Sequence, residues 1–203
     1  MKVTVLGASG HAGSEITKEL ARRGHHVTGI ARTPSRIPQG DNIQAIAGDV
    51  NHKEDLLPHL QGADAVVSAL MFSDAGPDLM LDLVKTAGVK RYLVVGGAGS
   101  LEVAPSVRLV DTPEFPDEYK PEASVGVKFL ERLKQETELD WTFLSPSIFF
   151  EDGPRTEKFR LGTDRPIFDA DGKSSISFAD YAIAMVDEIE NPVHSRRRFT
   201  VGY

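Results

Sequence analysis

Three glycines near the start of the chain have the spacing of a phosphate-binding turn. Gly7, Gly10 and Gly13 lie in the segment GASGHAG, which directly follows the apolar run Val3–Leu6. Glycines permit a tight turn and let the backbone approach a ligand, and the N-terminus of a following helix offers free N–H groups and partial positive charge. A strand, this motif and a helix in that order predict a dinucleotide site, although a glycine-rich turn without a ligand is the alternative. The predicted contacts are Gly7, Ser9, Gly10, His11, Ala12 and Gly13.

A second segment bears on which dinucleotide binds. Arg32, Ser35 and Arg36 follow the second predicted strand, and no acidic residue occurs between residues 28 and 39. An NAD enzyme usually places Asp or Glu here, where it accepts a hydrogen bond from the ribose 2′-hydroxyl. A guanidinium instead pairs with a phosphate. We therefore predict NADP(H) in preference to NAD(H), with these three residues as contacts, against the alternative of a basic loop facing solvent.

These residues need a scaffold that brings strand ends and helix starts together. Short apolar runs alternate with amphipathic segments along the chain, which predicts an α/β fold with a Rossmann-like, doubly wound parallel sheet. The predicted strands are Val3–Leu6, His26–Ile30, Ile43–Ala47, Ala65–Ala69, Tyr92–Val95 and Trp141–Leu144. The predicted helices are Ala12–Arg23, Lys53–Leu60, Asp78–Ala87, Glu122–Glu138 and Ala179–Glu190.

The last part of the chain changes character. Phe150–Asp171 contains many Gly, Pro, Asp and Arg residues, Ser177 to Asp180 resembles a capping box, and Arg197–Val201 suggests a terminal strand. We predict one domain over residues 1–203, in which 1–147 form the cofactor-binding core and 148–203 a small C-terminal substrate lobe over the carboxyl ends of the strands. The run from Arg196 to Arg198 is expected to face solvent.

Composition excludes several kinds of function. The chain has 203 residues, no cysteine and a formal net charge of −7. Without cysteine there is no disulfide, thiolate metal site or cysteine nucleophile, and we predict no metal site. An acidic chain argues against sequence-independent binding of nucleic acid, and no apolar stretch has the length of a membrane span. We expect a cytoplasmic protein whose partner is a small-molecule acceptor; the sequence does not distinguish monomer from homodimer.

The order of several segments resembles a known group of proteins. VTVLGASGHAG, VTGIARTPSRI, IAGDV, DAVVSAL, RYLVVGGAGS, WTFLSPS and ISFADYAIAMVDEIE follow one another as in the atypical NAD(P)-binding group of the short-chain dehydrogenase/reductase superfamily. That group includes NmrA-like proteins and the biliverdin-IXβ/flavin reductase type. The resemblance implies further cofactor contacts at Asp49, Val50, Ser68, Ala69, Leu70, Gly96, Gly97 and Pro146. The resemblance implies that Asp49 contacts the adenine amino group. The alternative is that Asp49 is the N-cap of the next helix.

The sequence departs from this superfamily where the catalytic residues are concerned. Typical members carry a Ser and a Tyr-x-x-x-Lys motif, in which the Tyr is the acid or base. No tyrosine here fits: Tyr92, Tyr119 and Tyr181 are followed at the fourth position by Gly96, Ala123 and Met185, and Tyr203 is the last residue. Ser100, Tyr119 and Lys120 could form a degenerate catalytic set, or Tyr119 and Lys120 could be surface residues at a helix start. The resemblance also implies that Ser147, where flavin reductases tend to have His, faces the substrate.

The missing tyrosine limits the chemistry. A ketone needs a proton delivered to the developing alkoxide, whereas solvent can protonate a reduced flavin or quinone. We therefore predict an NADPH-dependent oxidoreductase that transfers hydride to a small conjugated acceptor. Phe149, Phe150 and Phe168 could form an apolar wall beside the acceptor or belong to the core. One alternative is a non-catalytic, NmrA-like sensor of NADP(H); an epimerase or dehydratase of sugar nucleotides is less favoured, because epimerisation needs a positioned base.

Overall fold

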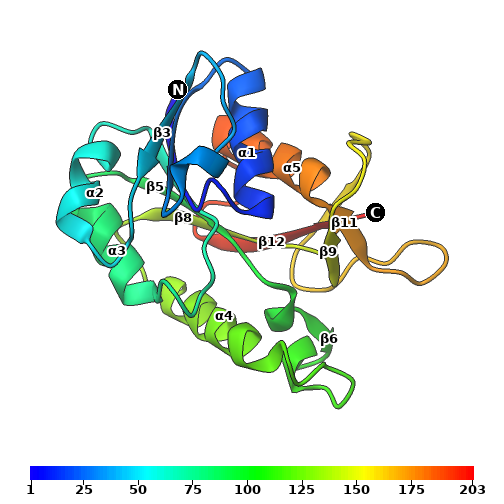
Figure 1. Ribbon diagram of the computed structural model, residues 1–203. Helices are drawn as coiled ribbons and strands as arrows, with labels where there is room; N and C mark the ends of the chain where they lie inside the picture. The colour runs from blue at the N-terminus through cyan, green and yellow to red at the C-terminus, as the bar shows by residue number, and fades with distance from the viewer.

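The computed structural model describes residues 1–203, and its centre is one eight-stranded sheet (Figure 1). The strand order is β10-β12-β8-β5-β4-β1-β2-β3, and only β10, at one edge, runs antiparallel to its neighbour. The strands are β1 (Lys2–Leu6), β2 (His26–Ala31), β3 (Ile43–Ala47), β4 (Ala65–Ser68), β5 (Arg91–Val95), β8 (Asp140–Ser145), β10 (Arg160–Gly162) and β12 (Arg197–Gly202).

The order of the strands reverses between β1 and β4. The chain begins at β1, moves outward through β2 to β3, and then returns to the other side of β1 to form β4, β5, β8 and β12. In open α/β sheets a ligand binds at such a switch point, in the crevice outside the carboxyl ends of the strands. The predicted doubly wound α/β fold is confirmed, and the Gly7–Gly13 turn lies at the switch point because it follows β1 directly.

Helices cover both faces of the sheet. In Figure 1, α1 (His11–Arg22) and α5 (Phe178–Glu190) lie side by side on one face, and α2 (Lys53–Leu60), α3 (Pro77–Thr86) and α4 (Lys120–Leu133) cover the other. Successive residues of a strand point to opposite faces, so Val66 packs with α2, α3 and α4 while Val67 packs with α1 and α5. This double burial explains the continuous apolar runs of the central strands. None of the five helices combines the length and apolar character needed to cross a bilayer.

The remaining elements are short and lie mostly beyond the carboxyl ends of the strands. They are η1 (Pro34–Arg36), η2 (Ala98–Ser100), β6 (Glu102–Ala104), β7 (Val107–Arg108), η3 (Leu109–Asp111), β9 (Phe149–Glu151) and β11 (Ser175–Ser177). β6 and β7 form an antiparallel pair, and β9 pairs with β11 in parallel. Within residues 148–203, α5, β10 and β12 belong to the main layers of the fold. β9 and β11, with the loops between them other than β10, lie outside the central sheet.

Two differences from the sequence-based expectation concern the end of a helix and the run of arginines near the C-terminus. The helix expected to reach Glu138 ends at Leu133, because the buried carboxylate of Glu136 accepts the backbone N–H of Glu138 at 2.7 Å and so stabilises a turn into β8. Arg198, expected to face solvent, has a side chain only 5% exposed. Its guanidinium donates to the carboxylate of Asp164 and to Ser100, so this arginine is a structural link and not part of a solvated face.

Candidate functional site

Two glycines of the N-terminal turn are required by packing. Gly7 has φ +82°, and a Cβ there would lie 2.3 Å from the carbonyl oxygen of Ala69. A Cβ on Gly13 would lie 2.1 Å from the carbonyl oxygen of Gly7. Both distances are far inside van der Waals contact, so β1, the turn, α1 and the end of β4 approach one another only because these positions lack side chains.

Gly10 is different, because the fold does not require it. It is the N-cap of α1 with φ −80° and ψ 172°, a conformation open to any residue. A Cβ there would meet only the Gly7 carbonyl oxygen, at the ordinary distance of 3.4 Å, and otherwise point into open space. Gly10 lines a groove, so what a side chain at this position would obstruct is the groove itself. The space in front of Gly10 is therefore not filled by other parts of the protein.

The backbone beside Gly10 carries unpaired donors. The N–H groups of Ser9, His11, Ala12 and Gly13 donate to no group of the protein, no side chain caps α1, and its first turn contains no acidic residue. The start of the helix therefore keeps its partial positive charge and points several donors at one place. Such a site suits the phosphates of a dinucleotide.

The groove extends from this turn across the ends of β1, β2 and β3 and encloses about 240 Å³. Its lining is Leu6, Gly7, Ser9, Gly10, Ile30, Ala31, Arg32, Thr33, Arg36, Gly48, Asp49, Val50, Asn51, Ala69, Leu70, Met71 and Asp74. Of the predicted cofactor contacts it brings together Gly7, Ser9, Gly10, Arg32, Arg36, Asp49, Val50, Ala69 and Leu70. The predicted contacts outside its lining are His11, Ala12, Gly13, Ser35, Ser68, Gly96, Gly97 and Pro146.

The far end of the groove is basic on one side and acidic on the other. Arg32 is 73% exposed, and its Nη2 lies 3.3 Å from Oδ2 of Asp74, on the loop after β4. Arg36, in η1, is exposed and forms no ion pair with the protein. Two guanidinium groups therefore border a space into which an anionic group of a ligand could enter.

Asp49 does not cap the helix that follows it. The N-cap of α2 is His52, without any side-chain capping bond. The Asp49 carboxylate instead accepts the backbone N–H and the side-chain amide of Asn51, both at 2.9 Å. These hydrogen bonds hold the pKa of Asp49 below its usual value, and the nearby His52 and Arg32 act in the same direction. Asp49 is thus an ionised acceptor on the wall of the groove.

At the ends of β4, β5 and β8, the predicted contact residues outside the groove lining have side chains that are absent or buried, so mainly their backbone could contact a ligand. The hydroxyl of Ser68 is buried and bonds the Tyr92 hydroxyl at 2.9 Å. A Cβ on Gly96 would lie 2.4 Å from the ring of Phe143, so packing requires this glycine. Gly97 meets nothing nearer than 3.5 Å, and Pro146 is buried.

The structure does not support the predicted orientation of Ser147. Its side chain is fully buried, and Oγ donates to the carbonyl oxygen of Val201 at 2.9 Å. β12 therefore covers this hydroxyl, which contradicts the prediction that Ser147 faces a substrate. The reason is that β12 joins the sheet next to β8 and closes over the segment that leaves it.

Ser100, Tyr119 and Lys120 are not joined by any hydrogen bond. Ser100 is 8% exposed, and Arg198 donates to both its carbonyl oxygen and its Oγ, each at 3.3 Å. Tyr119 is 61% exposed at the N-cap of α4, and Lys120 is the first residue of that helix. This arrangement matches the alternative in which Tyr119 and Lys120 are surface residues at a helix start.

The hydroxyls of the other three tyrosines are bonded within the protein. Burial raises the pKa of Tyr92 and of Tyr181, whose hydroxyl donates to the carbonyl oxygen of Leu144 at 2.7 Å. Burial also raises the pKa of Tyr203; Ser177 lowers it in part, and the Asp180 carboxylate raises it further. None of these three hydroxyls lines the groove.

Sequence reasoning missed the partners of His11. Its ring stacks on Phe178 with centroids 5.2 Å apart, and its Nδ1 lies 3.9 Å from the Asp152 carboxylate. Phe178 in turn contacts Phe150, which packs into the core against Tyr181, whereas Phe149 remains 52% exposed. Phe168 is 48% exposed. Of the three aromatic residues considered for an apolar wall, Phe150 is therefore the one that packs, partly buried, against the core. No local signal links residues 11, 152 and 178.

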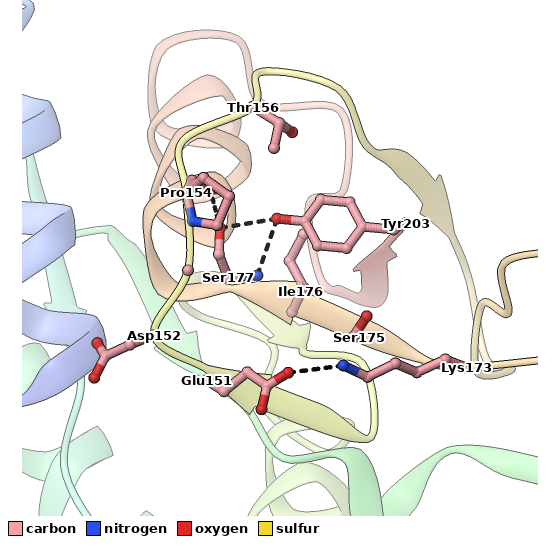
Figure 2. A pocket seen from close by; sticks show the side chains of 10 residues that line it. Glu151, Asp152, Pro154, Thr156, Lys173, Ser175, Ile176, Ser177 and Tyr203 are labelled. Atoms are coloured by element: carbon pink, nitrogen blue, oxygen red, sulfur yellow. Dashed lines mark hydrogen bonds and ion pairs between the residues drawn. The ribbon is translucent and has the colours of Figure 1, made fainter.

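A second pocket of about 300 Å³ lies between the β9–β11 pair and the C-terminus (Figure 2). Its polar groups mostly bond one another: the hydroxyl of Tyr203 bonds Oγ of Ser177 at 2.9 Å, and Lys173 pairs with Glu151 at 2.9 Å. Figure 2 shows Asp152 pointing away from these groups, toward α1. The bonds from Ser177 to Pro154 and from the backbone of Thr156 to Asp180 hold the loop after β9 against the start of α5.

Comparisons with known proteins agree with this geometry. A family profile described as NAD(P)H-binding matches residues 7–192. The chain is 46% identical over 214 aligned residues to the YwnB protein of Bacillus subtilis, covering 99% of this chain and 98% of that one. Two solved structures are also similar. One, from Bacteroides thetaiotaomicron and provisionally named an epimerase, has 41% identity and a TM-score of 0.93, covering 100% of this chain and 96% of that one. The other, from Streptococcus pneumoniae and provisionally named an NADH-flavin reductase, has 37% identity and a TM-score of 0.85, covering 100% and 99%.

Proposed function

The chain belongs to the NAD(P)H-binding family, and we propose that it is a reductase that uses NADPH to reduce a small conjugated acceptor such as a flavin or a quinone. The observation that carries this proposal is a groove that has unpaired backbone donors at one end and two arginines at the other. Free N–H groups at the start of α1 lie at one end, and Arg32 and Arg36 lie at the other. The bound nicotinamide would supply the hydride.

The lining residues suggest how the chain holds the cofactor. The N–H groups around Gly10 would bind the pyrophosphate, and Asp49 would accept from the adenine amino group. Arg32 and Arg36 would pair with the 2′-phosphate, which NADPH has and NADH lacks. The absence of an acidic residue from the end of β2 through η1 supports this preference, because a carboxylate there would bind the free ribose hydroxyl of NADH instead.

The type of acceptor follows from what the site lacks. The hydroxyls of Tyr92, Tyr181 and Tyr203 are bonded within the protein and outside the groove, and Tyr119 is exposed at the start of α4 without a bonded partner. An acceptor that needs no proton from the protein during hydride transfer suits such a site. The provisional name of the Streptococcus pneumoniae relative, with flavin as acceptor, agrees with this class.

Turnover with a panel of acceptors tests the reaction. Pure protein with NADPH and excess flavin, quinone or simple ketone should oxidise NADPH with the conjugated acceptors and not with the ketone. Gly10→Asp is the control, because it puts a carboxylate where the pyrophosphate would lie while leaving the turn free of clashes. Equal rates in the two proteins, or turnover of the ketone alone, would refute the proposal.

Affinity measurements test the cofactor preference separately. The double variant Arg32→Ala with Arg36→Ala should bind NADPH at least about tenfold more weakly, since hydrogen bonds to charged groups contribute roughly 1.5–3 kcal/mol each. Binding of NADH should change by less than about twofold, because the 2′-hydroxyl carries no charge. Arg132→Ala is the matched control: it removes an arginine that pairs with Asp78, and neither residue lines the groove. An unchanged ratio of NADH to NADPH dissociation constants would contradict the assignment.

One observation favours a second candidate, a sensor of the NADP(H) redox state. Neither serine that could have assisted catalysis is free, since Ser147 is covered by β12 and Ser100 is held by Arg198. A sensor would turn over no acceptor but would bind NADPH and NADP⁺ with different affinities, because only differential affinity can shift a conformational equilibrium. Equal affinities for the two forms would exclude this second function.

A further inference from the structure

An ion pair joins two walls of the groove. Arg32 follows β2, and Asp74 lies on the loop between β4 and α3, so the pair connects segments on opposite sides of β1. Both residues line the same space, and both side chains are accessible, at 73% for Arg32 and 46% for Asp74. The arginine that would bind an anionic ligand therefore already faces an anion of the protein.

The loop that carries Asp74 is held firmly in place. The carboxylate of Glu122, in the first turn of α4, accepts the backbone N–H groups of Phe72 and Ser73. The ring of Phe72 is buried against Phe129. The backbone N–H of Asp74 itself donates to the carbonyl oxygen of Met71 at 3.1 Å. The position of Asp74 beside the groove is therefore set by tertiary packing and does not depend on the ion pair alone.

The carboxylate of Asp74 has Arg32 as its one bonded partner in the protein. By contrast, Asp49, the other carboxylate near Arg32, accepts two hydrogen bonds from Asn51 at Oδ1. Arg36 has no acidic partner. The groove thus holds one guanidinium that is free and one that an acidic side chain occupies when no ligand binds.

We infer that Asp74 is a specificity-determining residue, which competes with the cofactor 2′-phosphate for Arg32 and so limits the preference for NADPH over NADH. This inference rests on the proposed binding of NADPH by Arg32 and Arg36. A phosphate that pairs with Arg32 must displace the Asp74 carboxylate and then lies close to it, and like charges repel. NADH carries no charge at this position, so its binding is expected to be nearly indifferent to Asp74.

The variant Asp74→Asn removes the charge and keeps the shape. Exposed ion pairs are weak, so we expect NADPH to bind about two- to fivefold more tightly and NADH to change by less than about 1.5-fold. The difference should shrink at high salt, where exposed charges are screened. In an Arg32→Ala background the effect of Asp74→Asn on NADPH should fall below about 1.5-fold, because there is then no guanidinium to compete for.

Fluorescence or calorimetric titration of the ligand-free protein with NADPH and NADH gives these constants without any acceptor. Asp78→Asn is the matched control, because it makes the same change in net charge on α3 next to a different arginine. Weaker NADPH binding in Asp74→Asn would overturn the inference, because it would show that Asp74 supports cofactor binding and does not compete with it. Equal changes in the NADPH and NADH dissociation constants, or no change in either, would also overturn it. So would an effect on NADPH binding that stays undiminished in the Arg32→Ala background. If the double arginine variant leaves the NADH to NADPH ratio unchanged, the proposed cofactor preference fails; if that ratio falls but Asp74→Asn does not raise it, only the role of Asp74 fails.

Discussion

Replacing two neighbouring glycines separately distinguishes what the fold needs from what a ligand needs. Gly13→Ala should destabilise the protein, whereas Gly10→Ala should leave it nearly as stable but weaken binding of NADPH. The two positions belong to one motif and are three residues apart, so the sequence alone gives no reason to expect different outcomes. The reason lies in what surrounds each Cβ.

The expected magnitudes follow from the distances. A Cβ on Gly13 would lie 2.1 Å from the Gly7 carbonyl oxygen, 2.9 Å from its carbon and 3.2 Å from Cβ of Ala69. Because two of these atoms are backbone, the turn must move, and overpacking of this kind costs about 1–3 kcal/mol. Alanine recovers up to about 1 kcal/mol of helix propensity, which leaves a net loss of roughly 2 kcal/mol at the upper end. For a chain of this size that corresponds to a decrease in Tm of about 4–8 °C.

The same arithmetic gives a small effect on stability at Gly10. The new Cβ would make one ordinary contact, at 3.4 Å from the Gly7 carbonyl oxygen, and the backbone conformation suits alanine. Alanine is a poorer N-cap than glycine, so some stability is lost, but the loss in free energy of unfolding should stay below about 1 kcal/mol. The methyl group would occupy the groove where the backbone must approach the pyrophosphate, so NADPH should bind roughly tenfold more weakly, or about 1.4 kcal/mol.

Two measurements on the same pair of variants test this reasoning. Urea unfolding gives the free energy of unfolding, and titration with NADPH at a temperature where both variants are folded gives the dissociation constant. Equal losses of stability at the two positions would refute the packing argument. Wild-type affinity in Gly10→Ala would show that Gly10 is not part of the cofactor site.

Two further changes test other parts of the structure. Asp180→Asn should lower the free energy of unfolding by about 2–3 kcal/mol. This fully buried carboxylate accepts hydrogen bonds from Thr156, Glu157 and Tyr203, and the new amide N–H₂ would face these donors. Chemical denaturation measures the loss, and a change below about 0.5 kcal/mol would contradict this prediction. Glu136→Gln should destabilise the protein at pH 7, and the effect should diminish as pH falls below about 4.3, the pKa of an unfolded Glu. Burial raises the pKa of Glu136, yet the bonds from Lys85 and from two backbone N–H groups outweigh it, so the folded pKa is lowered. The ionised form therefore stabilises the fold above the unfolded pKa, and this stabilisation is lost as pH falls through the folded pKa. A difference between wild type and variant that stays constant from pH 7 to pH 3 would contradict this assignment.

Local patterns predicted the layers of the fold and the basic outline of the site. Apolar runs such as Ala65–Ser68 are continuous because both faces of a central strand are covered, and this pattern is visible without a structure. The glycine spacing after Leu6 and the arginines after β2 are likewise local, because the turn and the end of the next strand meet whenever two parallel strands pair. The groove that contains both confirms that they lie together.

The sequence did not reveal the orientation of side chains whose neighbours are distant along the chain. Ser147 follows β8 by two residues, outside the regular alternation of a strand, and the packing of β12 decides that its hydroxyl is buried. Arg198 belongs to a run of three arginines, yet its position in β12 turns it toward Ser100 and Asp164. In both cases the neighbour that decides the orientation lies more than 30 residues away along the chain.

The same limit applies to the charges that tune the site. By itself, the sequence determined the glycine turn after β1 and the arginines after β2, because each depends on the order of residues within one β–α unit. The strand order that places this turn at a switch point came from the tertiary structure. Only the tertiary structure decided that Asp74 faces Arg32 and that Asp152 faces His11, since these pairs join loops from different units. Loops at the same edge of a sheet meet through the packing of the helices and strands that carry them, and no spacing along the chain records that contact.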